Sequence, residues 1–520
     1  MTEYRSESDT MGEVRVPFSV HYGAQTQRAS DNFKISGIRF PRRFIRMLGL
    51  VKAAAAEVNK EFGLVSNDFA DAIVTAAREV ADGQWDQEFV LDIFQTGSGT
   101  STNMNANEVI ASRANELIGG TRGDVSPIRP NDHVNRCQSS NDVIPTAIHL
   151  SVLEGIDQDL LPAIEKLASG LEAKAIEFSD VLKVGRTHLQ DAVPILLGQE
   201  FSAWASQLRH GMTRIRATRV HLLELPIGGT AIGTGLNAHP EFGERTCRIL
   251  AKTAVPGVRM ADNLFESISA RDAVVEASAT LKTLAVSLIK IAGDIRLLSC
   301  GPRTGIAEIS IPALQPGSSI MPGKVNPVMP EMMIQVCAQV IGNDAAVTLG
   351  GLMGQLNLNA MMPLMAHNVL QSISILSAAC RAFDDKCVSE GPVMSGSPDN
   401  TRGITANRER CRLLVESSLM SVTALVPKLG YQQAAKIASE SLRTGRTIRD
   451  VVLAQNLISA TELDSLLDLT SMTQPSAGHW GSAATNKSSE HAASPVSESA
   501  NAIDRWRDDG GQQLVESSGS

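Results

Sequence analysis

Apolar residues recur every three or four positions along most of this chain, a spacing that is typical of helices burying one face. Two helices are predicted early in the chain, one from Pro41 to Phe62 and one from Ser66 to Gly83. Five long helices are predicted further on, with a kink at Pro162 in the first: 153–178, 197–222, 278–298, 331–349 and 359–385. Because the third is apolar on nearly every side, we expect a helical bundle buried against other subunits.

Changes in composition along the chain predict where its domains begin and end. We expect an N-terminal domain at 1–138, a central helical-bundle domain at 139–388, a linker or inserted loop at 389–402, a small C-terminal helical domain at 403–470 and a disordered tail at 471–520. The tail is rich in Ser, Ala and Gly and has few large apolar residues to form a core. Since aromatic residues make up only 4% of the chain, the fold class predicted is all-α, mainly helical.

The overall composition narrows the classes of partner and compartment. The chain has 520 residues, a net charge of -9 and no basic block, which argues against nucleic acid or an anionic membrane as a partner. Seven scattered cysteines without a CxxC pair indicate reduced thiols rather than a disulfide framework or a zinc site. The acidic N-terminus resembles neither a signal nor a transit peptide, and no apolar run approaches membrane-spanning length. We therefore expect a cytoplasmic protein without a metal site.

One polar stretch, QPGSSIMPGKVNPVMPE at 315–331, contains too many Gly and Pro residues for a regular helix or strand. Its hydroxyls, ammonium and carboxamide suit an anionic, oxygen-rich ligand, although an ordinary surface loop is the commoner meaning of such a stretch. A phosphate-binding P-loop is excluded by spacing, because five residues separate Gly317 from Gly323 and Val325 follows Lys324. Glu331 comes where a helix could begin after Pro330.

Four further polar clusters interrupt the helical pattern. They are QTGSGTSTNMNANE at 95–108, NDHVNRCQSSN at 131–141, GRTHLQD at 185–191 and GGTAIGTGLN at 228–237. The glycines at 97 and 99 lack the third glycine of a dinucleotide site, so a capped helix entrance explains the first cluster as well as a ligand site does. His188 alone is more often structural than catalytic, but it lies between Thr187 and Asp191 at an expected loop-to-helix junction.

Together these motifs resemble the fumarase/aspartase superfamily, and specifically its class II, iron-independent fumarases. GSSIMPGKVNP at 317–327 is the most specific match, and QTGSGTSTNMNANE, QSSND and GRTHLQD agree with it in family order. The resemblance covers roughly residues 10–470. It implies a three-domain fold whose long helices form the core of a homotetramer, with each active site built from three chains. It also implies reversible hydration of fumarate to (S)-malate, a step of the citric acid cycle, with no cofactor.

The resemblance also assigns roles to residues of this chain. Ser318 matches the base that takes the C3 proton of malate, His188 the general acid/base acting on the departing hydroxyl, and Glu331 the carboxylate that orients this histidine. The positions that match substrate-binding residues are Ser98, Gly99, Thr100, Ser139, Ser140, Asn141, Thr187, Ser319, Lys324, Val325 and Asn326. A second, peripheral dicarboxylate site matches Arg129, Pro130, Asn131 and Asp132. There the family often has HPND, and an arginine grips carboxylates but does not shuttle protons as histidine does.

Two alternatives remain open. Aspartase uses the same serine loop, and GQLNLN at 354–359 leans toward it, whereas the residues nearest the chemistry favour fumarase. A catalytically silent structural member of the superfamily is the other alternative. Against it, Ser318, Lys324, Asn326, His188 and Glu331 are all present.

Overall fold

The computed structural model describes residues 3–389 and 403–475, and the chain divides into two compact units, Met1–Ser418 and Leu419–Ser520. Most of the expected linker at 389–402 and most of the expected tail at 471–520 lie outside the described residues. Of these two segments, the structure describes Ser389 and residues 471–475, in which Ser471–Thr473 forms a short 3₁₀ helix, η6.

The first unit begins with a β-hairpin and a group of helices. Their bounds are β1 (Tyr4–Asp9), β2 (Gly12–Pro17), α1 (Ala24–Asn32), α2 (Arg42–Glu61), α3 (Asn67–Ala81), η1 (Asp86–Glu88), α4 (Thr100–Leu117) and η2 (Pro130–Val134). The two helices predicted in this part of the chain are confirmed as α2 and α3, which pack against each other. Small side chains such as Ala54 and Ala76 allow this close packing, because both are almost fully buried.

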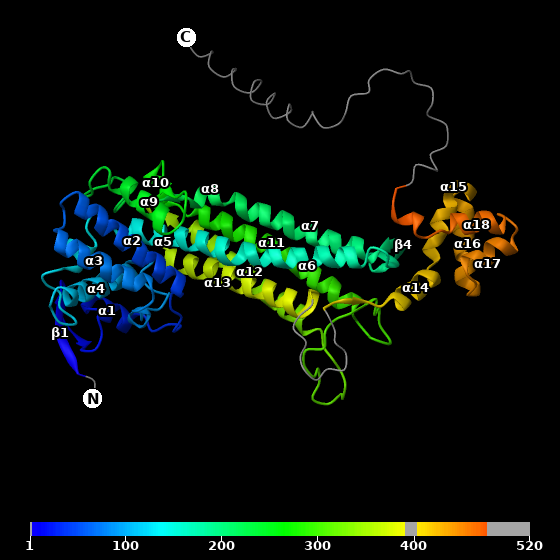
Figure 1. The fold of residues 1–520 in the computed structure, drawn as a ribbon, viewed down its shortest axis with the longest axis horizontal. Helices are drawn as coiled ribbons and strands as arrows, with labels where there is room; N and C mark the ends of the chain where they lie inside the picture. Colours follow the sequence, from blue (N-terminus) through cyan, green and yellow to red (C-terminus); the bar gives the residue numbers. More distant parts are fainter. Residues whose placement is uncertain (1–2, 390–402, 476–520) are drawn as a thin grey trace, which may run out of the picture. The chain divides into compact units, whose positions relative to one another are not determined.

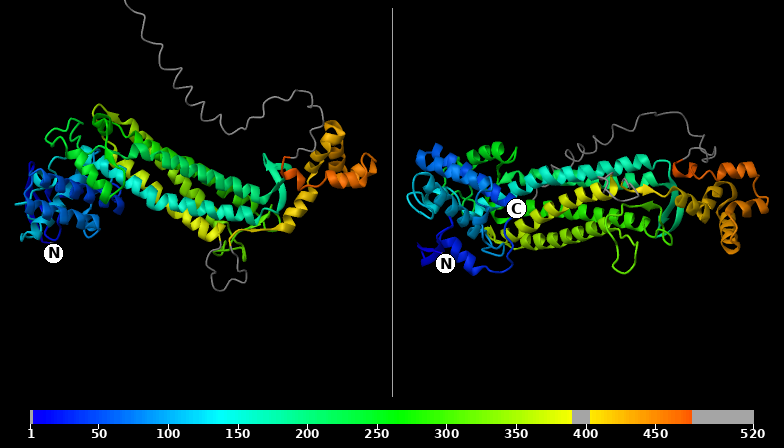
Figure 2. Two further views of the ribbon diagram at one scale, coloured as in Figure 1. Left: turned by 45° about the horizontal axis from the view of Figure 1, so that its top comes forward. Right: turned by 60° about the horizontal axis from the view of Figure 1, so that its bottom comes forward.

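The long helices, with the short helical turns that adjoin them, form the predicted bundle (Figure 1). They are α5 (Ser140–Gly155), the π-helical turn η3 (Ile156–Leu160), α6 (Leu161–Glu177), α7 (Leu197–Ala217), α8 (Arg219–Leu222), α11 (Asp272–Leu298), α12 (Val328–Leu352), α13 (Met362–Phe383) and the π-helical turn η4 (Asp384–Val388). Figure 2 shows the bundle from two further sides, in which α6 packs against α7, and α12 packs against both α11 and α13. The expected break at Pro162 is displaced, because the π-helical turn lies just before Pro162, which occupies the first turn of α6.

Short elements connect the bundle helices. They are β3 (Leu182–Thr187), β4 (Gln190–Leu196), β5 (Glu224–Leu225), α9 (Phe242–Thr253), β6 (Arg259–Met260), α10 (Leu264–Ser269), β7 (Ile309–Ser310), β8 (Gly354–Gln355), β9 (Leu358–Asn359), β10 (Thr405–Ala406) and α14 (Arg408–Ser417). Strands β3 and β4 form an antiparallel hairpin in which Thr187 pairs with Gln190. The loop expected over GRTHLQD is therefore the end of a β-hairpin.

Helix α12 is apolar but only partly covered within one chain. Over eighteen residues its mean hydropathy is 1.2 and a third of that window is buried, so by length and composition alone it could cross a membrane. It nevertheless buries Asp344, which accepts hydrogen bonds from Ser278 at 2.8 Å and Lys282 at 2.5 Å on the neighbouring α11. Gly342 and Leu349 lie on its exposed side. This exposed side of α12 is an apolar surface on the face of the bundle.

The second unit is a small helical domain with a core of its own. Its elements are η5 (Leu419–Leu425), α15 (Val426–Leu429), α16 (Tyr431–Thr444), α17 (Ile448–Ala454) and α18 (Ala460–Leu466). Ile437, Val451 and Leu463 are fully buried at its centre. Side-chain caps start the last two helices, since Thr447 accepts from Asp450 N and Ser459 accepts from Glu462 N.

Candidate active site

Hydroxyl groups from two helix N-termini meet at one end of the first unit. Ser98 Oγ lies 2.7 Å from Thr100 Oγ1, which lies 2.7 Å from Ser140 Oγ. Asn141 donates its carboxamide N–H to the backbone oxygen of Ala231, at 2.8 Å. We call this group the hydroxyl cluster, and its members are Ser98, Thr100, Ser139, Ser140 and Asn141.

The local sequence explains why these hydroxyls converge. Gly99 precedes α4 with φ 71°, a left-handed conformation that glycine adopts without strain. Ser139 precedes α5 and forms a capping box with Asp142, in which each side chain accepts a hydrogen bond from the backbone of the helix start. Two helix N-termini therefore direct their unpaired N–H groups and the positive ends of their dipoles to one place, an arrangement that favours an anion.

Gly97 brings another helix close to the hydroxyl cluster. A Cβ atom added at Gly97 would lie 1.8 Å from the backbone oxygen of Ala360, so no other residue fits. The oxygen of Gly97 in turn accepts from Met362 N, at 3.0 Å, at the start of α13. On the other side, a cavity of about 520 Å³ extends from Thr100 to the side chain of Arg28. Thr100 is the member of the hydroxyl cluster that lines this cavity, which is large enough for a small dicarboxylate.

A buried carboxylate, Asp142, fixes the backbone beneath the hydroxyl cluster. Its oxygens accept from the N–H groups of Ser139 at 2.9 Å, Thr230 at 2.9 Å and Gly228 at 3.2 Å. Burial raises the pKa of Asp142 to about 7, against the three backbone N–H groups and the charge of Lys52, which lower it. The start of α5 and the glycine-rich loop at 228–237 are therefore held by the same side chain.

The sequence reasoning did not single out Asp142. The signal was present, because Ser followed three residues later by an acidic residue predicts a capping box. Lys52 was also missed, although it is the one charged residue in the apolar stretch 47–56 of the predicted first helix. It is fully buried, and burial lowers the pKa of its ammonium to about 7 while the charge of Asp142 raises it.

His188 lies at the tip of the hairpin of β3 and β4. Residues His188 and Leu189 have φ 56° and 60°, so a two-residue turn with two left-handed residues joins the strands, as the twist of a hairpin requires. Non-glycine residues in this conformation are strained, and such strain is often found at functional positions. Thr187 and His188 are both exposed.

A buried ion-pair group anchors the hairpin. Glu308, which is fully buried, lies 3.2 Å from the ammonium of Lys183 and accepts two hydrogen bonds from Arg186, at 3.0 and 2.9 Å. Lys183 also donates to Glu200 at 2.9 Å. Because charged groups fix both residues on β3, the direction in which the hairpin presents His188 is set by the protein interior.

The serine loop, residues 315–327, has the irregular backbone that its sequence predicts. Its ends are joined, because Gly317 N donates to Lys324 O at 2.7 Å and Asn326 donates its carboxamide N–H to Gly317 O at 2.6 Å. The Ser318 hydroxyl oxygen accepts from Ile320 N at 3.2 Å and from Met321 N at 2.9 Å. The loop thus turns two backbone N–H groups toward one serine oxygen.

The rest of the loop is open to solvent, and the next helix begins earlier than expected. Ser319, Lys324 and Val325 are exposed. Helix α12 starts at Val328, before Pro330, and Glu331 lies in its first turn, where a carboxylate is stabilised by the helix dipole.

One chain does not bring all the predicted residues together. The hydroxyl cluster, at the N-termini of α4 and α5, lies at one end of the bundle, and the β3–β4 hairpin with His188 lies at the other (Figure 1). The serine loop, between α11 and α12, projects from the bundle away from the hydroxyl cluster (Figure 2). The candidate active site of a single chain is therefore divided into three separate parts.

The predicted second dicarboxylate site, at 129–132, lies at the start of η2. Arg129 Nη1 is 3.5 Å from Asp132 Oδ2, and both side chains are more than half exposed. Arg129 N also donates to His133 Nδ1, at 2.9 Å. Any anion at Pro130–Asn131 would therefore compete with Asp132 for the guanidinium.

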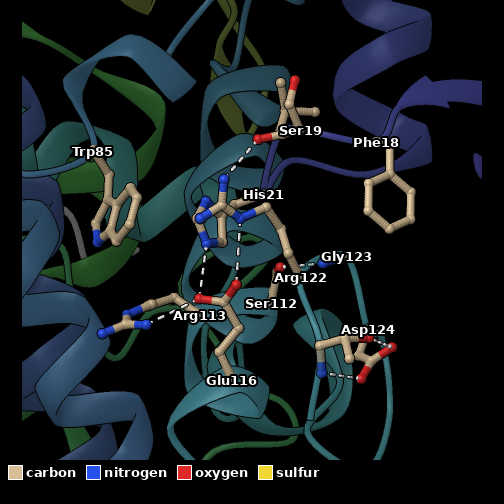
Figure 3. A network of polar contacts seen from close by, with 12 residues as sticks. Phe18, Ser19, His21, Trp85, Ser112, Arg113, Glu116, Arg122, Gly123 and Asp124 are labelled. Atoms are coloured by element: carbon tan, nitrogen blue, oxygen red, sulfur yellow. Dashed lines mark hydrogen bonds and ion pairs between the residues drawn. The ribbon is translucent and has the colours of Figure 1, made fainter. Parts of the chain in front are cut away.

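A buried polar network holds the chain that leads to this second site (Figure 3). His21, which is 1% exposed, has Nε2 3.1 Å from Glu116 Oε2. Arg122 donates to Glu116 at 3.3 Å and to the backbone oxygen of Ser19 at 2.9 Å, and Arg113 donates to Glu116 at 2.9 Å. One carboxylate on α4 therefore joins the N-terminal segment to the loop after α4. His21 and Ser19 are far from α4 in the sequence, so the pattern did not predict these contacts.

Comparison with known proteins gives the class first. Residues 12–342 match a family described as lyase, and residues 422–474 match one described as fumarase C C-terminus, so the chain has the fold of a lyase. A fumarate hydratase class II from Nitrosomonas europaea is 49% identical over 474 residues, which cover 91% of this chain and 100% of the relative. The chain belongs to the class II fumarate hydratase family.

Other relatives agree with this family. A fumarate hydratase class II from Mycobacterium tuberculosis is 51% identical over 476 residues, covering 91% of this chain and 96% of the relative. The crystal structure of a recombinant class II fumarase from Schistosoma mansoni superimposes with a TM-score of 0.85 at 39% identity, covering 91% of this chain and 99% of that one. The mainly helical fold expected from the sequence is confirmed.

Proposed function

We propose that this chain is a fumarate hydratase, which reversibly adds water across the double bond of fumarate to give (S)-malate. The observation that carries the proposal is that the Ser318 hydroxyl oxygen accepts hydrogen bonds from two backbone N–H groups within the serine loop. Donors arranged around one oxygen stabilise negative charge on it, and a serine acting as a base needs that stabilisation. Family membership at about half identity supports the same reaction.

The hydroxyl cluster is proposed to bind the substrate carboxylates. Removing a proton next to a carboxylate creates a doubly negative aci-carboxylate, so the site must supply hydrogen-bond donors and positive charge. Hydroxyls at two helix N-termini provide the donors. From the serine loop, Lys324 and Asn326 add a cation and a carboxamide, and Thr187 joins them from the hairpin.

The proton transfers follow from this arrangement. In the direction from malate, the Ser318 alkoxide takes the C3 proton and the electron pair of that bond passes into the adjacent carboxylate. The electron pair then returns to form the C2–C3 double bond as the C2–O bond breaks, and the hydroxyl leaves as water with a proton from the imidazolium of His188. Glu331, in the first turn of α12, is proposed to orient this histidine and to balance its charge. Movement of the serine loop over the substrate would exclude bulk water from these steps.

A homotetramer is proposed because one chain leaves the site in three parts and leaves a face of α12 uncovered. The hydroxyl cluster of one chain, the hairpin of a second and the serine loop of a third would then complete each site. Exposed Leu349 and Leu352 on α12 would be buried between subunits. We further propose a cytoplasmic location and a role in the citric acid cycle, and anion binding at 129–132 through Arg129.

Spectroscopy with purified protein tests the proposed reaction. Incubation with malate should increase the ultraviolet absorbance of the fumarate double bond, and incubation with fumarate should decrease it. Incubation with aspartate tests the second candidate, aspartate ammonia-lyase, which GQLNLN at 354–359 favours. Turnover of aspartate alone would replace the proposal. A stable tetramer that turned over neither substrate would indicate a structural protein.

A further inference from the structure

Lys52 on α2 is a buried cation close to the hydroxyl cluster. Its side chain is fully inaccessible, and its ammonium donates to the carboxamide oxygens of Asn135 at 2.9 Å and Gln138 at 3.0 Å. Both acceptors are neutral, so the ammonium has no directly bonded counter-charge, although Asp142 is near enough to act on it electrostatically. A buried charge of this kind is costly unless something compensates it.

The contacts of Lys52 lead to both halves of the hydroxyl cluster. Asn135 Oδ1 also accepts from Asn103 Nδ2 at 3.2 Å, and Asn103 lies one helical turn after Thr100 on α4. Gln138 directly precedes Ser139, the cap of α5. One ammonium therefore fixes the groups that orient both helix N-termini.

We propose that Lys52 is a positioning residue for dicarboxylate binding, which holds the starts of α4 and α5 in register and supplies buried positive charge beneath them. The inference rests on the proposed function, because it concerns the same site. A bound dianion would offset the buried charge, which explains why a cation is kept among neutral carboxamides at a fully buried position. Burial lowers the pKa of Lys52 to about 7, and a neighbouring dianion would favour its charged form.

Steady-state kinetics of the full-length enzyme test this role. In Lys52→Met, the KM for fumarate and the inhibition constant of succinate, used as an unreactive dicarboxylate, should rise about tenfold or more, while kcat falls much less. Lys52→Gln keeps an N–H donor for the carboxamides, so it should recover part of the affinity. The matched control is Lys60→Met on the same helix, because Lys60 is partly exposed and pairs with Asp71 at the surface. Its constants should equal those of the wild type.

Other outcomes would overturn the proposal. It is wrong if Lys52→Met keeps the wild-type KM and inhibition constant, or if kcat alone falls. If Lys52→Met does not fold, Gln138→Met at a partly exposed position should still raise both constants, and unchanged constants there would also contradict it. Failure of the proposed function can be told apart from failure of the role of Lys52. In the first case the wild-type protein would not hydrate fumarate, and calorimetric titration would still compare the Kd of succinate between the wild type and Lys52→Met.

Discussion

Met321 donates its backbone N–H to the hydroxyl oxygen of Ser318 at 2.9 Å, so the side chain proposed as the base is hydrogen-bonded to the backbone of its own loop. Replacing Ser318 by alanine should lower kcat about a hundred- to ten-thousand-fold, because the base is lost while the carboxylate-binding groups stay. A strongly lowered kcat together with an unchanged Kd for succinate would agree with this prediction. The control is Ser202→Ala on the exposed side of α7, which should keep the wild-type kcat.

Near-normal turnover by Ser318→Ala would show that this serine is not the base.

Mixing inactive variants tests whether the site is shared between chains. Ser140→Ala damages the hydroxyl cluster and Ser318→Ala damages the serine loop, so each homotetramer should be inactive. After the two are unfolded and reassembled together, about a quarter of the sites should combine an intact hydroxyl cluster with an intact serine loop from another chain. If each site belonged to one chain, the mixture would stay as inactive as its components.

A charged side chain on the exposed side of α12 should break the assembly. A Cβ atom at Gly342 meets nothing within 4 Å in one chain, so Gly342→Arg leaves the fold of that chain intact. In the proposed tetramer the added guanidinium would meet a neighbouring helix and be desolvated without a partner. Light scattering should show a mass below that of four chains of 55.4 kDa each. Thr75→Arg on the exposed side of α3 serves as the control, and an unchanged mass in Gly342→Arg would contradict the interface.

The contribution of His149 to the stability of the protein should fall between pH 7.5 and pH 5.5. Burial, together with the charge of Arg271, lowers the pKa of His149 to about 3, whereas in the unfolded chain it is near 6.5. The unfolded state therefore binds the proton first as pH falls, and the stability present above pH 6.5 is lost progressively toward pH 3. Between pH 7.5 and pH 5.5 this loss of unfolding free energy is roughly 1.4 kcal/mol.

Urea unfolding of His149→Phe at both pH values measures this contribution. The variant should lose less stability than the wild type over the interval, whereas His221→Gln, at an exposed position, should behave as the wild type does. Equal losses in the wild type and in His149→Phe would show that this histidine does not carry the effect.

Removal of Glu308 should release the hairpin that carries His188. Glu308→Ala removes the buried carboxylate that pairs with Arg186 and leaves Lys183 with Glu200 alone, which costs roughly 3–5 kcal/mol of unfolding free energy. Glu409→Ala, which breaks an exposed ion pair with Arg412, should change stability little. Chemical unfolding and kcat should be measured together, since a stable Glu308→Ala with normal kcat would show that the ion pairs do not set the direction of the hairpin.

The bundle could be predicted from the sequence because a helical period survives in every long apolar segment. Helices α11, α12 and α13 all lie where that period placed them. The hairpin could not be predicted in the same way. A bulge between Val184 and Arg186 interrupts the alternation of β3, and the polar tip has the composition of an ordinary loop.

The sequence proposes members of the candidate site, and these stay predictions, but it does not give their arrangement within one chain. Polar motifs pointed to Ser140, His188 and Ser318. Their separation within one chain was implied only by the family resemblance, with its sites built from three chains, and not by any pattern along the chain. Lys52 and Asp142 were missed because their importance comes from burial and from partners distant in sequence. Such charges become visible only when packing brings α2, α5 and the loop at 228–237 together.

Because the hairpin tip and the hydroxyl cluster lie at opposite ends of one chain, the proposed activity depends on assembly and therefore on the protein concentration. With the proposed roles, the imidazole of His188 in a lone chain cannot reach a dicarboxylate at the hydroxyl cluster of the same chain. Dilution that dissociates the assembly should therefore abolish the specific activity, while the circular dichroism spectrum of the helices stays unchanged. The cell could adjust flux simply through how much of the protein it makes.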